Sequence, residues 1–426
     1  MTDASTSASS GAGISIPAPD EHVRRTVLPN GIRVVTDRLP TSRSVAASVW
    51  VGVGGRDESD ELSGASHFLE HLLFKGTEGR DAKAIAVAID AVGGDMNAFT
   101  ANEHTAYYAR VPAAEAYLGI DLLLDVVQRP ALRPWEFDGE REVILEELAA
   151  ADDDPDDVAS MKLFECLFPG HPLGREVLGT AESIDALERD QVAEFFAQWY
   201  TPVNIVVAAA GDIDHVALVE EVERRFGDRR SGQHPVRTPP SGDLVAESVA
   251  GRPIESVHLA MGWRAPSVDD DDRYALALLN HVFGSGPSSR LFQEVREDRG
   301  LTYSISSGVS HHVDTGALTV HCATAPGKLD ELNDVVDGIV VDLLQRGISR
   351  EELARAKGSL RGAYLMSYED VGSRMTRLGI SEIMRGRVTP IDEHLARLEG
   401  VTHDEVHRVA QRVLGTPRVL STVGPG

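Results

Sequence analysis

The stretch His67-Phe68-Leu69-Glu70-His71 holds polar side chains whose spacing suits metal chemistry. On a helix, positions i, i+3 and i+4 share one face, so His67, Glu70 and His71 point the same way. Burying three polar groups on an apolar helix is costly unless something compensates them. Two imidazoles can bind a metal ion directly, and the glutamate can act on the bound water as a general base. H-x-x-E-H is the inverted form of the zinc motif H-E-x-x-H.

The residues around this motif favour a buried helix. The alternative is a pair of solvent-facing histidines at the edge of a helix. Large apolar side chains on both sides of the motif argue against it: Leu69, Leu72, Leu73 and Phe74.

A catalytic zinc needs a third protein ligand and an open position for water. The helix expected over residues 134–151 offers carboxylates, and Glu140 and Glu147 lie along one side of it, two turns apart. Glu142 and Glu146 fit the solvated face of the same helix. The residues alone leave the choice of third ligand open.

Several helices and strands are expected to position these residues. Asn30-Gly31 predicts a hairpin turn between short strands over 25–28 and 32–35. Further strands are expected over 44–52, over 97–111 as strand pairs, and over 204–211. Helices are expected over 64–74, 83–92, 117–127 and 134–151.

Composition limits the class of protein. The 426 residues are 42% hydrophobic and 25% charged, which is typical of a soluble globular protein of two to three domains. The net charge of −26 repels nucleic acid, so we expect no nucleic-acid partner. It favours basic partners instead, although general solubility explains it equally well. No run of 18 apolar residues occurs, so we expect no membrane partner.

Cysteine usage and the first residues predict a cytoplasmic protein. Cys166 and Cys322 lie far apart and form no C-x-x-C pattern, which fits a reducing compartment. Residues 1–13 are mostly Ser, Ala, Thr and Gly, without the apolar run of a signal peptide. We expect residues 1–20 to be a disordered tail.

We expect the chain to form two domains, with a boundary near its middle. Residues 229–246 begin with a cluster of Pro, Gly and Ser and read as a linker between a domain at 21–228 and another at 247–426. The segments 122–129 (LLLDVVQR) and 339–346 (IVVDLLQR) look like copies of each other. An offset of 209 also lays 67–74 on 276–283, which pairs His67 with Leu276, Glu70 with Leu279 and His71 with Asn280. Chance similarity between amphipathic helices is the alternative to duplication.

Four motifs follow one another along the chain: Gly64 to Thr77; Asn97-Ala98-Phe99-Thr100 with Glu103-His104-Thr105 and Tyr107-Tyr108; Glu140 to Glu147; and Ser289-Arg290-Leu291 with Arg296 to Tyr303. In these motifs the sequence resembles the pitrilysin/insulysin family of inverted-zincin peptidases. It looks most like the short branch that includes mitochondrial processing peptidase and bacterial processing proteases. The resemblance covers about residues 23 to 423.

The resemblance implies roles in the first half of the chain. His67, His71 and Glu147 correspond to the ligands of one Zn²⁺ per chain, and Glu70 to the general base. Glu140 corresponds to a supporting carboxylate behind the histidines. Asn97, Ala98, Phe99 and Thr100 look like the edge strand that takes substrate by strand addition. His/His/carboxylate sites accept several divalent ions, so the metal in the cell stays open.

The resemblance also implies a role for the second half. Arg296 and Tyr303 look like the pair that reaches the substrate backbone and the developing oxyanion, with Asn97 as a second candidate for the oxyanion. Without the family, Arg296 reads as a surface charge. The implied fold is α+β: two similar duplicated α/β-sandwich domains, joined by a linker, that form a clamshell with its hinge near residues 229–242.

The implied function is a zinc-dependent endopeptidase that cleaves unfolded peptides, basic presequence-like ones among them, inside a closed chamber. Similarity to short-branch members also points to a homodimer. One rival is a non-cleaving, peptide-holding or regulatory subunit of the same fold, which would not need the intact ligand set. A zinc hydrolase acting on other substrates is the second rival, and the edge-strand motif argues against it.

Overall fold

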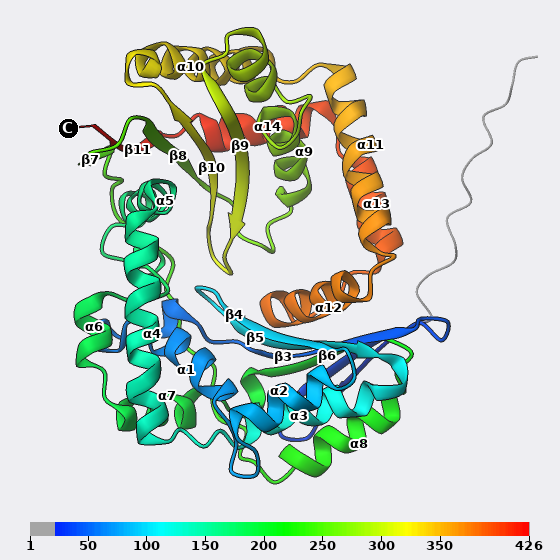
Figure 1. Ribbon diagram of the computed structural model, residues 1–426. Helices are drawn as coiled ribbons and strands as arrows, with labels where there is room; N and C mark the ends of the chain where they lie inside the picture. Colours follow the sequence, from blue (N-terminus) through cyan, green and yellow to red (C-terminus); the bar gives the residue numbers. More distant parts are fainter. Residues whose placement is uncertain (1–21, 426) are drawn as a thin grey trace, which may run out of the picture.

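The computed structural model describes residues 22–425 and arranges them as two halves, each built around one β-sheet (Figure 1). The expected tail at residues 1–20 lies outside the described residues. The strands of the first half are β1 (Val23–Val27), β2 (Arg33–Arg38), β3 (Ser44–Val51), β4 (Asp95–Thr100), β5 (Thr105–Pro112) and β6 (Ile205–Gly211). Its helices are α1 (Ala65–Phe74), α2 (Ala82–Asp90), α3 (Ala116–Gln128), α4 (Pro134–Asp153), α5 (Pro155–Leu167), α6 (Ala181–Ala186), α7 (Arg189–Trp199) and α8 (His215–Phe226).

The second half follows the same plan with fewer elements. Its strands are β7 (Glu247–Gly251), β8 (Val257–Ala265), β9 (Thr302–His311), β10 (Gly316–Thr324) and β11 (Val419–Gly424). Its helices are α9 (Arg273–Phe283), α10 (Leu329–Arg346), α11 (Arg350–Ser367), α12 (Val371–Arg385), α13 (Ile391–Gly400) and α14 (His403–Leu414), and a π-helical turn spans Phe292–Asp298.

The two sheets share one topology. The first has the order β1-β2-β6-β3-β5-β4, and the second has the order β7-β11-β8-β10-β9, which repeats the first from β2 onward. Strand directions agree as well, because β2 and β6 are parallel, as are β7 and β11, while the other pairs are antiparallel. Helix α1 follows β3 as α9 follows β8. The predicted α+β fold with two similar halves is therefore confirmed.

The central strands are apolar along their whole length because helices cover both faces of each sheet. All seven residues of β6 are buried, and β3 is buried except at Ser44. Helix α3 packs on one side of β3, and α12 packs on the other side against β3 and β6. A strand buried on both faces loses the alternation of polar and apolar residues that marks a half-exposed strand.

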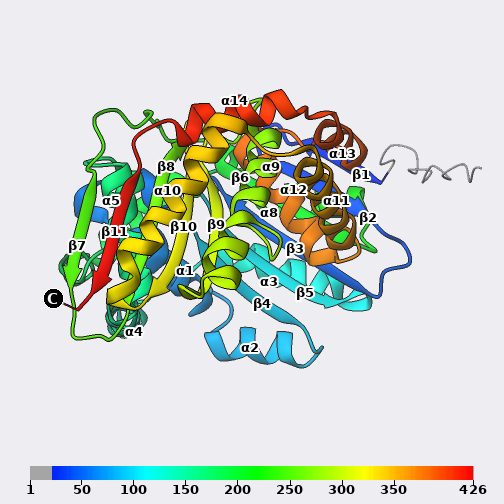
Figure 2. The same cartoon turned by 90° about the horizontal axis from the view of Figure 1, so that it is seen from above.

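Each half contributes one helix to the sheet of the other half. Helix α12 comes from the second half of the chain and lies across the first sheet, where Met375 and Leu378 pack with Trp50 (Figures 1 and 2). In return, α5 lies against β8 and β11, where Leu163 packs with Val419. The predicted domain ranges, 21–228 and 247–426, stay a prediction, and this packing crosses the line between them.

Ion pairs also join the halves. The guanidinium of Arg56, whose side chain is 2% exposed, lies 2.5 Å from Glu103 and 2.6 Å from Asp314, in the turn between β9 and β10. Arg237, in the expected linker, donates two hydrogen bonds to the carboxylate of Asp57 and one to the carbonyl of Glu103. The segment expected to act as a hinge is thus bound to the first half.

Most local expectations match the observed elements. The hairpin β1–β2 turns at Asn30-Gly31, where Gly31 has a φ of 103°. Helices α1 and α4 start within a residue of their predicted starts, as does strand β3. None of the helices among residues 22–425 combines the length and apolar content needed to cross a bilayer.

Candidate functional site

Helix α1 has one apolar face and one polar face. Phe68, Leu69, Leu72 and Leu73 are at most 1% exposed and belong to the core of the first half. His67, Glu70 and His71 are half-buried on the other face. The helix is therefore held by its apolar residues, and the polar residues of the motif project from it together, as the spacing predicts.

Helix α4 brings two glutamates to the histidines. The rings of Phe68 on α1 and Phe137 on α4 stack with centroids 4.3 Å apart. Beyond this contact, Glu147 Oε2 lies 3.6 Å from His67 Nε2 and 3.4 Å from His71 Nε2. One ligand atom from each of the three residues lies within 4.8 Å of the others.

These residues fit a zinc ion. Ligands at about 2.1 Å from a tetrahedral zinc lie roughly 3.4 Å from one another, close to the two measured separations. Burial and the nearby His71 lower the pKa of His67 to about 4, so this imidazole is neutral and offers a lone pair. Nδ1 of His67 is buried and has no hydrogen-bond partner among the described residues. Three donors that converge in this way match a His/His/carboxylate zinc site.

Glu140 supports one of the histidines. Its Oε2 lies 3.0 Å from His71 Nδ1, and its Oε1 forms an ion pair with Lys75 Nζ at 2.6 Å. A carboxylate can only accept hydrogen bonds, so Nδ1 of His71 carries the proton and Nε2 keeps its lone pair toward Glu147. The geometry is that of a carboxylate that orients a metal ligand.

Glu70 lies beside the ligand cluster and is held by the edge strand. Its Oε2 accepts a hydrogen bond from the Thr100 hydroxyl at 2.6 Å. Burial raises the pKa of Glu70 above its ordinary value, and the Thr100 hydrogen bond opposes part of that rise. A carboxylate with a raised pKa is a stronger base and suits proton transfer near neutral pH.

Among residues 22–425, strand β4 pairs only with β5 and so forms an edge of the first sheet. Ala98 and Thr100 are half-buried on the face toward α1, since Ala98 packs on the core and Thr100 reaches Glu70. Asn97 and Phe99 alternate to the other face, where the Phe99 ring lies 5.6 Å from Trp50. The structure therefore places Asn97 on the side of the sheet away from the histidines.

The pair from the second half lies apart from the cluster. The Arg296 guanidinium lies over the rings of Phe292 and Tyr303, at 4.5 and 5.4 Å from their centroids. Tyr303 is 88% exposed at the start of β9. Within residues 22–425, no hydrogen bond or ion pair joins Arg296 or Tyr303 to the histidines or Glu147.

Glu58 contributes to the site and was missed by the sequence analysis. It is 5% exposed, and its two oxygens accept hydrogen bonds from the backbone N–H groups of Gly64 and Ser66, at 2.8 and 2.6 Å. Gly64 begins α1 with a φ of 92° and has no side chain to cap it. Glu58 thus caps the helix that carries the histidines, from six residues upstream. In the sequence, an acidic residue upstream of a helix that lacks a capping side chain only weakly predicts such a cap. The path of the intervening loop decides whether the carboxylate reaches the first N–H groups of the helix.

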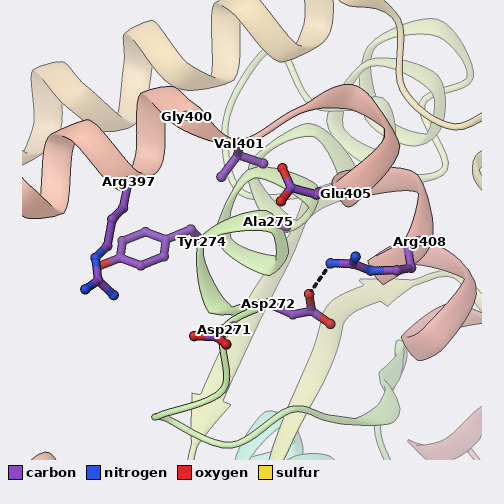
Figure 3. A pocket seen from close by; sticks show the side chains of 9 residues that line it. All are labelled: Asp271, Asp272, Tyr274, Ala275, Arg397, Gly400, Val401, Glu405 and Arg408. Carbon is purple, nitrogen blue, oxygen red and sulfur yellow. Dashed lines mark hydrogen bonds and ion pairs between the residues drawn. The ribbon is translucent and has the colours of Figure 1, made fainter.

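A second cavity has both acidic and basic side chains in its wall. A cavity of about 310 Å³ lies between α9, α13 and α14 in the second half (Figure 3). Arg408 lies 2.5 Å from Asp272 in its wall, and Arg412 also pairs with Asp272. No member of the histidine cluster belongs to this cavity.

Comparisons with known proteins identify the family of this chain. Residues 33–181 match the family model described as insulinase, peptidase family M16, and residues 186–360 match the model of the peptidase M16 inactive domain. An uncharacterized zinc protease of Mycobacterium bovis is 44% identical, over 96% of this chain and 94% of that protein. Similar zinc proteases occur in Streptomyces coelicolor, at 40% identity over 95% and 90% of the two chains, and in Bacillus subtilis, at 34% over 95% and 98%.

Solved structures share the fold. A peptidase M16 inactive domain from Pseudomonas fluorescens superposes with a TM-score of 0.87 at 21% identity, covering 95% of this chain and 98% of that one. A protease from Helicobacter pylori gives 0.87 at 22% identity, with 95% and 99% covered. The sequence relatives, the family models and the shared architecture agree, and the chain belongs to peptidase family M16, the pitrilysin/insulysin family.

Proposed function

We propose that this protein is a zinc-dependent endopeptidase that cleaves unfolded peptides. The observation that carries the proposal is the convergence of His67, His71 and Glu147, with Glu70 beside them. His67, His71 and Glu147 would hold one zinc ion, which supplies Lewis-acid polarisation of the scissile carbonyl and lowers the pKa of a bound water. A pure binding protein has no need for this set of donors.

The protein residues would then do the following work. Glu70 takes a proton from the attacking water and passes it to the leaving amine. The Thr100 hydroxyl holds one Glu70 oxygen and so sets the direction of the other. Glu140 keeps His71 in the tautomer that presents Nε2 to the metal.

The substrate would bind as an added strand along β4. An edge strand offers unpaired N–H and C=O groups to any extended peptide. Folded proteins rarely present an extended segment with free backbone groups. Unfolded segments are therefore the expected substrates, with basic ones favoured by the net charge of −26. A cytoplasmic location, and the lack of nucleic-acid and membrane partners, stay predictions from composition.

In a homodimer, Arg296 and Tyr303 of one chain could reach the candidate metal site of the other. The hairpin β9–β10 touches the first half at its tip, where the Val313 N–H donates to Glu103. Tyr303 lies ten positions before Val313 on the extended strand, so it is roughly 30 Å from this contact at about 3.3 Å per residue. Its exposed ring is thus available to a second copy, and we expect Arg296 and Tyr303 to complete the site of the partner chain.

Subunit mixing tests this arrangement. Glu70→Gln and Tyr303→Phe should each reduce turnover as pure proteins. Mixing the two should restore activity if Tyr303 acts across the dimer, because one site in each mixed dimer is then intact. A mixture no more active than its components would place Tyr303 in its own chain or outside the mechanism.

The function itself is tested with fluorogenic peptides. Wild type should cleave them in a chelator-sensitive way, and Glu70→Gln should bind zinc but lose cleavage. A lack of cleavage by zinc-loaded wild type, with peptides still bound, would favour the non-cleaving, peptide-holding role instead.

A further inference from the structure

Glu103 is a buried carboxylate in the turn that follows the edge strand β4. The turn spans residues 101–104, and a hydrogen bond from the Ala101 N–H to the His104 carbonyl closes it at 2.9 Å. The Glu103 side chain is 1% exposed. A buried carboxylate is costly unless charged or polar groups compensate it, so the partners of Glu103 show what the turn is attached to.

Each oxygen of the Glu103 carboxylate has a partner that leads to the second half. Oε2 accepts a hydrogen bond from the Val313 N–H at 2.9 Å, at the tip of the β9–β10 hairpin. Oε1 lies 2.5 Å from Arg56 Nη1, and the same guanidinium donates two hydrogen bonds to the Asp314 carboxylate, at 2.8 and 2.6 Å. Glu103 is therefore connected to the hairpin tip twice, once directly and once through Arg56.

The backbone next to Arg56 also binds this turn. The N–H groups of Gly55 and Arg56 donate to the carbonyls of Ala101 and Asn102, at 3.2 and 2.7 Å. A Cβ atom at Gly54 would lie 2.0 Å from the Ala101 oxygen, so this close approach requires glycine. These contacts join the turn, the Arg56 segment and the hairpin tip into one unit.

Thr100, the last residue of β4, connects this turn to the candidate general base. Its hydroxyl donates to Glu70 Oε2 at 2.6 Å, and its backbone continues into Ala101. Strand β4 is held by β5 on one side, whereas an inner strand is held from both sides. The position of β4 therefore depends strongly on what fixes its ends. A shift of the turn would move the Thr100 hydroxyl and change the direction of the Glu70 carboxylate.

A second ion pair with a buried carboxylate joins the halves at the opposite edge of the same sheet. Glu382 of α12 is buried, and it pairs with Arg25 of β1 at 2.8 Å and with Arg33 at 3.9 Å. The strand order places β1 and β4 at the two ends of the first sheet. Both ion pairs join the halves, but the pair at Glu103 is the one next to the strand that carries Thr100.

We propose that Glu103 and Asp314 are positioning residues through which the second half aligns the general base. The inference rests on the proposed peptidase function. The hairpin tip fixes Glu103, directly and through Arg56. Glu103 fixes the turn, and the turn sets the Thr100 hydroxyl against Glu70. The second half thus acts on a reaction whose candidate metal ligands all lie in the first half.

The kinetics of two matched variants test this coupling. Asp314→Asn and Arg25→Gln each neutralise the more exposed member of an ion pair between the halves. Asp314→Asn should reduce kcat on fluorogenic peptides by about ten-fold, because a small displacement of a catalytic group is costly. KM should change less, because β4 keeps its pairing with β5. Arg25→Gln should keep the kcat of wild type, and both variants should keep their zinc.

A double-mutant cycle shows whether the effect passes through Thr100. Thr100→Val removes the hydroxyl that holds Glu70. In this background, Asp314→Asn should reduce kcat by about two-fold or less, because residues that act along one path are not additive. Effects that multiply in full would overturn the proposed path, as would a wild-type kcat in Asp314→Asn alone.

Hydrogen–deuterium exchange tests the coupling without cleavage. In Asp314→Asn, exchange should accelerate more in β4 and the turn at 101–104 than in β1, and Arg25→Gln should show the reverse. Unchanged exchange in β4, or equal acceleration of β4 in both variants, would overturn the proposal. If zinc-loaded wild type cuts no peptide, the proposed function fails, and the exchange data alone decide whether the second half positions β4.

Discussion

Helices α1 and α9 occupy the same position in two similar halves but carry different side chains. Where α1 has His67 and Glu70, the predicted offset of 209 gives Leu276 and Leu279, both 0% exposed. His71 corresponds to Asn280, whose side chain accepts a hydrogen bond from Ser307 at 2.6 Å. Leu69 and Leu73 have buried apolar counterparts in Leu278 and Val282, whereas Leu72 corresponds to His281. The shared fold therefore depends on the apolar face, and the candidate chemistry depends on three positions that the fold does not need.

Helices α4 and α11 also differ at the positions of the candidate zinc site. Counted from the first residue of each helix, Glu140 corresponds to Ala356 and Glu147 to Ala363. Ala356 is the buried residue of α11, at the point where Glu140 is buried in α4. All of the candidate zinc-site carboxylates thus have neutral counterparts in the second half, which fits the match of residues 186–360 to an inactive domain.

The sharpest way to break the comparison is to give α1 the side chains of α9. Replacing His67, Glu70 and His71 by Leu, Leu and Asn should remove zinc and turnover. The loss should reach at least the 10²- to 10⁴-fold that removal of a general base alone causes. Thermal unfolding should remain cooperative, because the apolar face of α1 is unchanged. Zinc binding by this variant would contradict the assignment of the ligands.

The reverse comparison concerns stability. Leu279→Ala in α9 should lower the free energy of unfolding by about 2–5 kcal/mol, because it leaves a cavity in a packed core. Glu70→Ala at the corresponding position of α1 should leave stability almost unchanged or raise it. Urea denaturation of both variants measures the difference. Equal destabilisation would mean that the polar face of α1 is also part of the core.

A smaller effect separates the ligand from its support. Glu140→Gln should weaken zinc affinity by about 10- to 100-fold, because His71 loses the carboxylate that fixes its tautomer. Competition with a chelator measures the affinity. Glu142→Gln, on the exposed face of the same helix, is the control and should match wild type. If Glu140→Gln binds zinc as tightly as the control, the 3.0 Å contact has no supporting role.

The smallest expected effect concerns how the two helices begin. Glu58 caps α1, whereas Asp272 before α9 pairs with Arg408 and Arg412. Burial raises the pKa of Glu58 from 4.5 to about 7, so between these values the folded protein keeps a proton that the unfolded chain has lost. The contribution of Glu58 is therefore full below pH 4.5 and declines as the pH rises to 7.

Unfolding at several pH values tests this effect. The stability of wild type relative to Glu58→Gln should fall between pH 4.5 and 7. Glu78→Gln, which removes an exposed carboxylate in the loop after α1, should show little such trend. A wild-type advantage that grows with pH would contradict the direction of the shift.

The sequence predicted the parts of the fold that depend on local pattern. The 3.6-residue period placed α1, and Asn30-Gly31 placed the first hairpin, because each depends on neighbours in the chain. The grouping of Glu140 with Glu147 on one side of α4 followed from the same period. The exchange of α5 and α12 between the sheets was not predicted, because an amphipathic pattern shows that a face is buried but not which sheet covers it.

Contacts between distant segments explain the other gaps. Glu58 reaches α1 through a loop whose path no periodicity describes. The side of β4 to which Asn97 points depends on the register of the strand, and a shift of one residue reverses it. The contacts of Glu103 form only where residues 54–56, the turn after β4 and the tip of the β9–β10 hairpin meet.

The zinc content of three purified proteins tests the central claim most directly. Wild type should bind one zinc ion per chain, Glu147→Gln should lose most of it, and Glu146→Gln, one residue away on the exposed face, should keep it. That result would place the third ligand where α4 meets the two histidines. Full zinc content in Glu147→Gln, or none in wild type under saturating zinc, would contradict the account.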